Sequence, residues 1–217
     1  VLVVQTTKAQ KFYQDRLGLS NIAVVPNPII LEKFSSNRLF TDRGRTIVNI
    51  GRLTEEKCHG LLIESFATSR ARDLGWRLNI IGEGPLRMAL QEKIDQLRVG
   101  EYVFLLGNKQ DVSPYLNQAG IYVLSSRYEG FPNALMEALA SGVPCVSTDC
   151  DNGPSDLIQH GENGLLVPTG DIDKMSQAIN VLIDDVLMRE RFSEAGPVSV
   201  KKFDYKVIMK KWVDLLD

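Results

Sequence analysis

Two carboxylates with a fixed separation are the side chains of this sequence best placed for chemistry. Glu129 and Glu137 have seven residues between them. The first follows an apolar run, residues 121–124, that is typical of a strand, and the second lies in a helix predicted over residues 132–141. Carboxylates at such a junction accept hydrogen bonds from sugar or ribose hydroxyls, and the first N–H groups of the helix suit a phosphate. Each glutamate taken alone could equally be a solvated surface charge.

A second loop carries two cations. Arg52 and Lys57 follow the apolar run 47–50, and Gly51 stands between the strand and the loop. An arginine fork and a lysine point charge in one strand-end loop can hold a diphosphate. Without this context they would be two ordinary surface cations.

The elements that must position these groups alternate between strand and helix. This alternation indicates an α/β fold, a Rossmann-like parallel sheet with helices on both faces. Gly51, Gly82 and Gly107 each follow a predicted strand, and because crossovers are right-handed we expect their loops to share one sheet edge with the Glu129 loop. We expect strands at residues 47–50, 78–81, 103–106, 121–124, 144–147 and 165–167, and helices at 60–73, 85–98, 112–119, 132–141, 154–159 and 172–187.

The two ends of the chain have a different character. Residues 1–30 predict a strand, a helix ended by Gly18 and a second strand, too small a unit to bury both faces alone. Residues 31–45 are polar and are interpreted as a linker. Residues 203–216 predict a basic amphipathic helix, which either lies on an anionic membrane or packs on protein with a solvated lysine face.

Composition excludes several classes of function. The net charge of -2 argues against a nucleic-acid partner, and no apolar run approaches the roughly 20 residues that span a bilayer. Three cysteines without a C-x-x-C pair argue against a disulfide framework and fit a reducing compartment. With only two histidines, a zinc site is not expected.

Several motifs, in order, resemble those of retaining GT-B glycosyltransferases, and most closely glycosyltransferase family four, also called glycosyl transferases group 1. Residues 129–137 resemble the E-x7-E motif, and residues 51–57 resemble G-R-L-x-x-x-K. Cys58 departs from the pattern, because the family often has glycine there. Residues 82–85 resemble a G-x-G-P turn, and residues 149–154 resemble a loop that ends in Gly-Pro.

Two further motif matches add less to the resemblance. Asp149 and Asp151 resemble the D-x-D that binds a divalent metal in GT-A enzymes, but their place in the motif order fits the GT-B loop instead, so no bound metal and no cofactor besides the donor substrate are implied. Residues 163–171 match the family's N-G-L-L-V-x-x-G-D, which we interpret as a turn, a strand and a helix capped by Asp171.

The resemblance implies a role for each matching residue. Arg52 and Lys57 would bind the donor's diphosphate and stabilise it as the leaving group. Glu129 would contact the sugar and steady developing positive charge, which makes these three the predicted catalytic residues. Glu137 would bind the ribose hydroxyls. The other predicted donor-binding residues are Gly51, Gly84, Asn108, Lys109, Gly130, Phe131, Pro132, Asn133, Ala134 and Leu135.

The reaction implied by the resemblance moves a hexose or N-acetylhexosamine from a nucleoside diphosphate sugar, with a UDP-sugar favoured, to a hydroxyl of a glycan or lipid-linked sugar acceptor, with retention. The setting would be bacterial surface polysaccharide or glycan synthesis, in the cytoplasm or peripherally at the inner face of the membrane. Two alternatives stay open: a GT-B sugar nucleotide epimerase, and a non-catalytic sugar nucleotide binding module.

The same resemblance divides the chain. Residues 1–30 would be the remnant of an N-terminal acceptor domain, 31–45 a linker, 46–200 the donor-binding domain, and 201–217 a C-terminal helix that returns toward the first domain. The chain begins at Val1 without a signal peptide pattern, so we interpret it as a piece of a longer protein that binds donor but is inactive alone.

Overall fold

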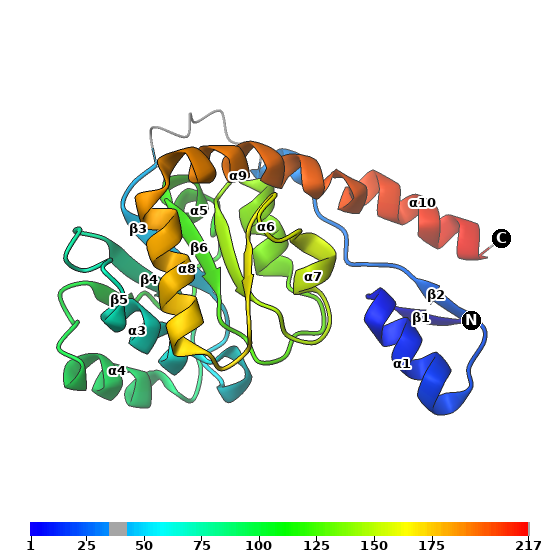
Figure 1. Ribbon diagram of the computed structural model, residues 1–217. Helices are drawn as coiled ribbons and strands as arrows, with labels where there is room; N and C mark the ends of the chain where they lie inside the picture. The colour runs from blue at the N-terminus through cyan, green and yellow to red at the C-terminus, as the bar shows by residue number, and fades with distance from the viewer. Residues whose placement is uncertain (35–42, 217) are drawn as a thin grey trace.

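The body of the molecule is a six-stranded sheet in the order β5-β4-β3-β6-β7-β8, with every neighbouring pair parallel (Figure 1). The computed structural model describes residues 1–34 and 43–216. Parallel strands need a crossover between them, and helices supply these crossovers. The predicted α/β, Rossmann-like fold is therefore confirmed. The strands are β3 (Thr46–Ile50), β4 (Arg77–Ile81), β5 (Val103–Leu105), β6 (Ile121–Leu124), β7 (Cys145–Thr148) and β8 (Leu165–Val167).

The central strands are buried on both faces, which explains their continuous apolar sequence. Successive residues point to opposite faces. Ile47 and Val123 join the core that α3, α4 and α8 cover, and Val48 and Tyr122 join the core that α5, α6 and α7 cover. All four are at most 1% exposed. The covering helices are α3 (His59–Thr68), α4 (Arg87–Gln96), α5 (Ser113–Gln118), α6 (Asn133–Ala140), α7 (Pro154–Leu157) and α8 (Ile172–Asp184).

Each of these helices is shorter than the sequence predicted, although α3 begins one residue earlier, at His59, and ends at Thr68 instead of residue 73. Pro132 is the N-cap of α6 rather than its first helical residue. Val112 is the N-cap of α5 rather than its first helical residue, and the Asp111 carboxylate accepts a hydrogen bond from the Ser113 backbone N–H at 3.0 Å. Both differences are single-residue shifts at helix ends, where assignment is least sharp.

The helix predicted over residues 172–187 is confirmed at its start, but it ends at Asp184 rather than at residue 187. A separate helix, α9 (Val186–Ser199), follows, and the sequence analysis did not predict it. The Asp185 carboxylate accepts a hydrogen bond from the Met188 backbone N–H at 2.8 Å and so begins α9. Gly196 and Pro197, residue types that disfavour a helix interior, both lie in its last turn. Gly196 also packs against α6, where an added Cβ would lie 2.9 Å from the Leu139 carbonyl oxygen.

A small two-stranded parallel sheet lies beside the body (Figure 1). It is built from β1 (Leu2–Val4), α1 (Thr7–Leu17) and β2 (Ile22–Val24). The Thr6 side chain caps α1 by accepting from the Ala9 backbone N–H at 3.1 Å, and the predicted end at Gly18 is confirmed by its left-handed φ of 63°. This unit falls in the range 1–30 that we assigned to a separate domain, and the division into domains stays a prediction.

The chain passes from this unit to the body and returns at its end. A short helix, α2 (Leu31–Phe34), opens the predicted linker, whose residues 35–42 lie outside the described part. After a single turn, η3 (Lys201–Phe203), the last helix α10 (Tyr205–Leu216) extends from the body toward β1 and β2 (Figure 1). Residue 217 of the predicted tail is also outside the described part. Among the described helices, none combines the length and the apolar character needed to cross a membrane.

The junction between α8 and α9 generates a stability prediction. Asp185→Ala removes the N-cap of α9 and should lower the free energy of unfolding by about 1 kcal/mol. Asp185→Asn keeps an N-cap side chain and should stay close to the wild type. Urea unfolding followed by circular dichroism measures both. Equal loss in the two variants would show that the negative charge, rather than the cap, begins the helix.

Candidate active site

The carboxyl ends of four neighbouring strands bring the predicted loops together, because the strands are parallel. Gly51 after β3, Gly82 after β4 and Gly107 after β5 lie along this edge as predicted. Gly82 approaches so closely that a Cβ on it would lie 1.9 Å from the Gly51 carbonyl oxygen, and its φ of 149° is one that other residues rarely adopt. Only glycine therefore lets the β4 loop support the loop that carries the two cations.

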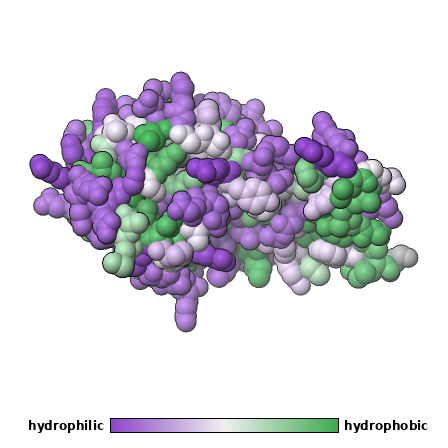
Figure 2. Space-filling view, turned by 90° about the horizontal axis from the view of Figure 1, so that it is seen from below, coloured by the Kyte–Doolittle hydropathy of each residue, from purple (hydrophilic) through white to green (hydrophobic). Residues whose placement is uncertain are grey.

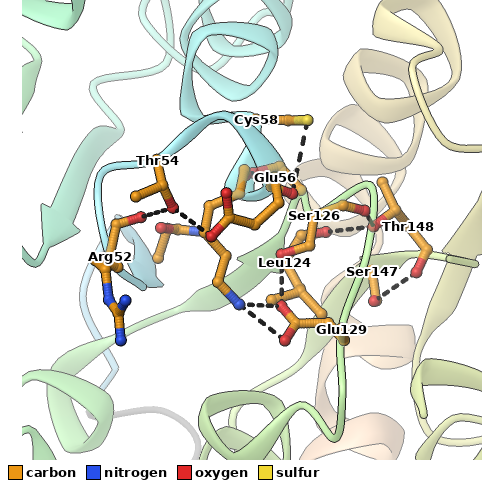
Figure 3. Close-up of polar contacts among 12 residues, drawn as sticks. Arg52, Thr54, Glu56, Cys58, Leu124, Ser126, Glu129, Ser147 and Thr148 are labelled. Atoms are coloured by element: carbon orange, nitrogen blue, oxygen red, sulfur yellow. Dashed lines mark hydrogen bonds and ion pairs between the residues drawn. The ribbon is translucent and has the colours of Figure 1, made fainter. Parts of the chain in front are cut away.

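An ion pair joins the cation loop to the glutamate loop. Lys57 Nζ lies 2.7 Å from Oε1 and 2.8 Å from Oε2 of Glu129, and donates a hydrogen bond to each. Ser126 Oγ donates to the same Oε1 at 2.6 Å (Figure 3). Glu129 is only 6% exposed. Each carboxylate oxygen thus has a partner, as a buried charge requires.

Backbone contacts fix this pair on both sides. The Ser125 hydroxyl donates to the Lys57 carbonyl oxygen at 2.8 Å, and the Arg127 N–H donates to the Glu56 carbonyl oxygen at 2.8 Å. The Thr148 hydroxyl, at the end of β7, donates to the Ser126 carbonyl oxygen at 2.6 Å (Figure 3). Hydrogen bonds therefore join the ends of three strands, β3, β6 and β7, around Glu129. Sequence reasoning missed the two serines, whose only signal was two small hydroxyls between a buried strand and a charged loop.

A pocket of about 480 Å³ opens between the two loops and the start of α6. Arg52 is exposed in it, and its guanidinium extends from the loop without a polar contact to the residues drawn in Figure 3. Among the residues that the structure describes, no side chain caps the N-terminus of α6, so its partial positive charge faces the pocket. The predicted site residues that line the pocket are Gly51, Arg52, Lys57, Glu129, Gly130, Phe131, Pro132, Asn133 and Ala134.

Glu137 does not line this pocket. It lies one turn along α6, in an adjoining pocket of about 330 Å³ that it shares with Lys33, and Asn133 belongs to both pockets. Burial raises the pKa of the Glu137 carboxyl, and the positive charge of Lys33 partly opposes this rise. A ligand that reached both glutamates would have to extend past Asn133.

The remaining predicted site residues lie elsewhere. Gly84 packs against the backbone of Leu53, where a Cβ on Gly84 would lie 2.4 Å from the Leu53 carbonyl oxygen. In the structure Gly84 therefore allows the loop after β4 to pack closely against the cation loop. Asn108 and Lys109 are exposed beyond β5, and the Lys109 ammonium lies 6.0 Å from the centroid of the Tyr115 ring. Leu135 is fully buried in the core. Their predicted contacts with a donor stay predictions.

The two acidic residues compared with a metal-binding D-x-D differ in their surroundings. Asp151 forms an ion pair with Lys8 of α1, and Asp149 is exposed. Within residues 1–34 and 43–216, no three His, Cys, Asp or Glu side chains come together in a way that could hold a metal ion.

A family model described as glycosyl transferases group 1 matches residues 32–198. The chain belongs to the glycosyl transferases group 1 family. It is 36% identical, over 217 residues, to the exopolysaccharide phosphotransferase SCO2592 of Streptomyces coelicolor, covering 99% of this chain and 23% of that protein. It is 29% identical, over 221 residues, to the amylovoran biosynthesis glycosyltransferase AmsD of Erwinia amylovora, covering 100% of this chain and 62% of that protein.

A solved structure shows the same fold. A mutant of S. aureus TarM, in complex with fondaparinux, alpha-GlcNAc-glycerol and UDP, matches with a TM-score of 0.92 and 24% identity, over 99% of this chain and 43% of that one. The chain therefore spans less than two thirds of the length of each of these three proteins.

In this member of the glycosyl transferases group 1 family, Cys58 follows the cation loop in place of the expected glycine. Its φ of 50° and ψ of 39° are left-handed, the conformation that glycine adopts most easily. The loop therefore keeps a path suited to glycine despite the substitution. Cysteine in place of glycine at position 58 therefore strains the backbone but does not redirect the loop.

A buried histidine lies directly beneath the site and was missed by sequence reasoning, which used the histidine count only to exclude zinc. His59 is the first residue of α3 and is 1% exposed. A Cβ on Gly51 would lie 3.6 Å from His59 Nε2. Neither ring nitrogen has a hydrogen-bond partner among the described residues. Burial, with a smaller effect of the Lys57 charge, lowers the pKa of His59 from 6.5 to about 4.

This histidine generates a pH prediction. Folding holds His59 neutral, whereas the unfolded chain protonates it below pH 6.5. The stability that depends on neutral His59 is fully present above pH 6.5 and is lost as the pH falls toward 4, by up to about 1.4 kcal/mol per pH unit. In His59→Leu this loss should disappear, so its stability should fall less steeply than that of the wild type over this range. Urea unfolding at stepped pH measures the difference, and parallel curves would contradict a depressed pKa.

Proposed function

We propose that the chain is the donor-binding part of a retaining glycosyltransferase, of the kind classed as family four, that transfers a hexose or N-acetylhexosamine from a UDP-sugar to a hydroxyl acceptor. The observation that carries this proposal is the convergence of Arg52, Lys57 and the N-terminus of α6 on one pocket opposite the buried Glu129. The positive groups match a diphosphate, and the carboxylate matches a sugar.

In the proposed reaction, the bond between the anomeric carbon and the diphosphate oxygen breaks while a bond to the acceptor oxygen forms. The proton of the acceptor hydroxyl leaves with the diphosphate. Negative charge therefore grows on the leaving group, where Arg52 and Lys57 stabilise it more strongly than they stabilise the bound substrate. Positive charge grows on the sugar, where Glu129 steadies it.

The pairing of Lys57 with Glu129 suits the role of Lys57 toward the diphosphate and the role of Glu129 toward the sugar. Before the donor binds, each charge neutralises the other in a half-buried site, which limits the cost of desolvation. A bound diphosphate gives Lys57 a second anion within reach, and part of the Glu129 carboxylate becomes available to sugar hydroxyls. Ser126 keeps one carboxylate oxygen in place during this exchange.

Glu137 is assigned to the ribose. Its pKa is raised because burial disfavours its charged form, and two ribose hydroxyls would supply the hydrogen bonds that stabilise a carboxylate. Its pocket adjoins the diphosphate pocket at Asn133. A nucleoside diphosphate lying along the start of α6 would occupy both pockets, with the phosphates toward Arg52.

The relatives support a UDP-sugar and a role in bacterial surface polysaccharide synthesis. TarM holds UDP in its solved structure, and the two curated relatives are named for exopolysaccharide and amylovoran. The acceptor would be a glycan or a lipid-linked sugar. We propose a cytoplasmic setting with peripheral membrane contact, supported by α10, on which the exposed Trp212 lies among Lys206, Lys210 and Lys211.

The proposal predicts nucleotide binding by the chain itself. In calorimetric titration with EDTA present, UDP should bind more tightly than GDP or ADP. Arg52→Ala and Glu137→Ala should each weaken UDP binding on the order of tenfold or more, because each removes a charge-assisted contact. Arg72→Ala and Glu162→Ala, which change exposed charges outside both pockets, are matched controls and should bind as the wild type does.

Two results would contradict the proposal. One is the absence of binding for every nucleotide by a folded chain. The other is UDP binding that Arg52→Ala and Glu137→Ala leave unchanged.

A further inference from the structure

A chain of three side-chain amides connects the unit of β1, α1 and β2 to the start of α6. Gln5 Nε2 donates a hydrogen bond to Asn27 Oδ1 at 2.6 Å, and Asn27 Nδ2 donates to Asn133 Oδ1 at 3.0 Å. Gln5 follows β1, Asn27 follows β2, and Asn133 is the first residue of α6. The amide chain therefore ends at the helix terminus that faces the proposed donor.

The direction of these bonds fixes which group Asn133 offers to a ligand. A side-chain amide has a carbonyl oxygen that accepts hydrogen bonds and an NH₂ group that donates them. In both bonds of the chain, the NH₂ group of one residue faces the carbonyl oxygen of the next. The Asn133 oxygen is therefore engaged with Asn27, whereas its NH₂ group donates to no acceptor in the described part of the protein. Asn133 thus presents a hydrogen-bond donor.

Asn133 lies where the two pockets of the proposed donor meet. It lines the pocket that contains Arg52 and also the pocket that contains Glu137, and it is exposed to a ligand in either. A nucleoside diphosphate with its ribose near Glu137 and its outer phosphate near Arg52 would pass Asn133 with the phosphate that is attached to the ribose. That phosphate carries negative charge and only accepts hydrogen bonds, so an amide NH₂ group is a matching partner.

The backbone at this end of α6 supplies fewer donors than a helix terminus usually does. The first N–H groups of a helix have no partner within it and are available to an anion. Here Pro132 has no N–H, and the Asn133 N–H donates to the Phe131 carbonyl oxygen at 2.9 Å. A ligand can therefore use neither position as a backbone donor. The Asn133 side chain supplies a donor at the same place.

The amides belong to a polar part of a unit that is otherwise rich in exposed apolar side chains. Figure 2 shows apolar side chains gathered at the end of the molecule that carries β1, α1 and β2. Gln5, by contrast, lies beside the glutamate loop, where a Cβ on Gly130 would lie 3.9 Å from Gln5 Oε1. The large apolar residues exposed on the unit are Val1, Leu2, Phe12, Leu17 and Leu19.

We propose that the Asn133 side-chain amide donates a hydrogen bond to the donor phosphate next to the ribose, and that Gln5 and Asn27 are positioning residues that hold this amide in its donating orientation. Without Asn27, the Asn133 amide is free to turn and offer its oxygen, which repels a phosphate. Gln5 holds Asn27 in the same way, because its NH₂ group engages the Asn27 oxygen.

The assignment rests on the proposed function, because it takes the ribose toward Glu137 and the outer phosphate toward Arg52. It deepens that proposal by giving the inner phosphate its own partner. It also makes donor binding depend on two residues of the range 1–30, outside the predicted donor-binding domain.

The first test compares two substitutions of Asn133 by calorimetric titration of UDP into the whole chain. Asn133→Ala should weaken UDP binding about tenfold, because it removes a hydrogen bond to a charged group. Asn133→Asp should weaken it further, because a carboxylate then faces the phosphate, although a negative charge in the first turn favours the helix itself. A partner of the ribose hydroxyls would behave differently, since aspartate accepts hydrogen bonds from hydroxyls and would preserve the affinity.

The second test is a double-mutant cycle for Asn27. Asn27→Ala should weaken UDP binding about threefold in the wild-type chain and have no further effect in Asn133→Ala, because Asn27 acts only through Asn133. Asn27→Leu keeps the volume of the side chain and should give the same result, and circular dichroism confirms that each variant is folded. Asn21→Ala changes an exposed asparagine of the same unit outside both pockets and should bind as the wild type does.

The outcomes separate this inference from the proposed function. If UDP binding depends on Arg52 but both Asn133 variants bind as the wild type does, the inference is overturned while the donor site stands. The same conclusion follows if Asn133→Asp binds at least as tightly as Asn133→Ala, or if Asn27→Ala weakens binding equally with and without Asn133. If the folded wild type binds no UDP, or binds it independently of Arg52, the donor site fails and the inference fails with it.

Discussion

The ion pair between Lys57 and Glu129 is the interaction on which the site depends. It connects the loop after β3 to the loop after β6, two neighbouring strands of one parallel sheet. With 24% of the Lys57 side chain and 7% of the Glu129 side chain exposed, neither charge is well solvated, so each needs the other. Removing one partner would leave a poorly solvated charge, at a cost of several kcal/mol.

The surrounding structure can be understood as support for this pair. Gly82 permits the β4 loop to press against Gly51, and the serines that follow β6 tie the glutamate loop to the cation loop and to β7. The result is a pocket lined by two cations, Arg52 and Lys57, and two carboxylates, Glu56 and the buried Glu129, built on strand ends rather than on long loops. The pocket is formed before any ligand arrives, which would lower the cost of organising it around the proposed diphosphate.

The sequence predicted the parts of this structure that repeat with a regular period. Buried strands followed by glycine, and amphipathic helices between them, indicated the sheet, its two covered faces and the edge at which the predicted loops meet. The break between α8 and α9 could not be predicted, because it depends on a cap at Asp185 and on Gly196 fitting against α6. The ion pair of Lys57 with Glu129 was not predicted either, since the two residues are 72 positions apart in the sequence and only the fold brings their side chains together. His59 gave no signal in the sequence beyond its residue type.

A crystal structure of the chain with UDP would show whether the pocket around Lys57 and Glu129 receives a nucleoside diphosphate. We expect the diphosphate within hydrogen-bonding distance of Arg52 and Lys57 at the start of α6, the ribose hydroxyls on Glu137, and the Glu129 carboxylate still held by Ser126. UDP bound at any other place, or with its phosphates directed away from Arg52 and Lys57, would contradict this expectation.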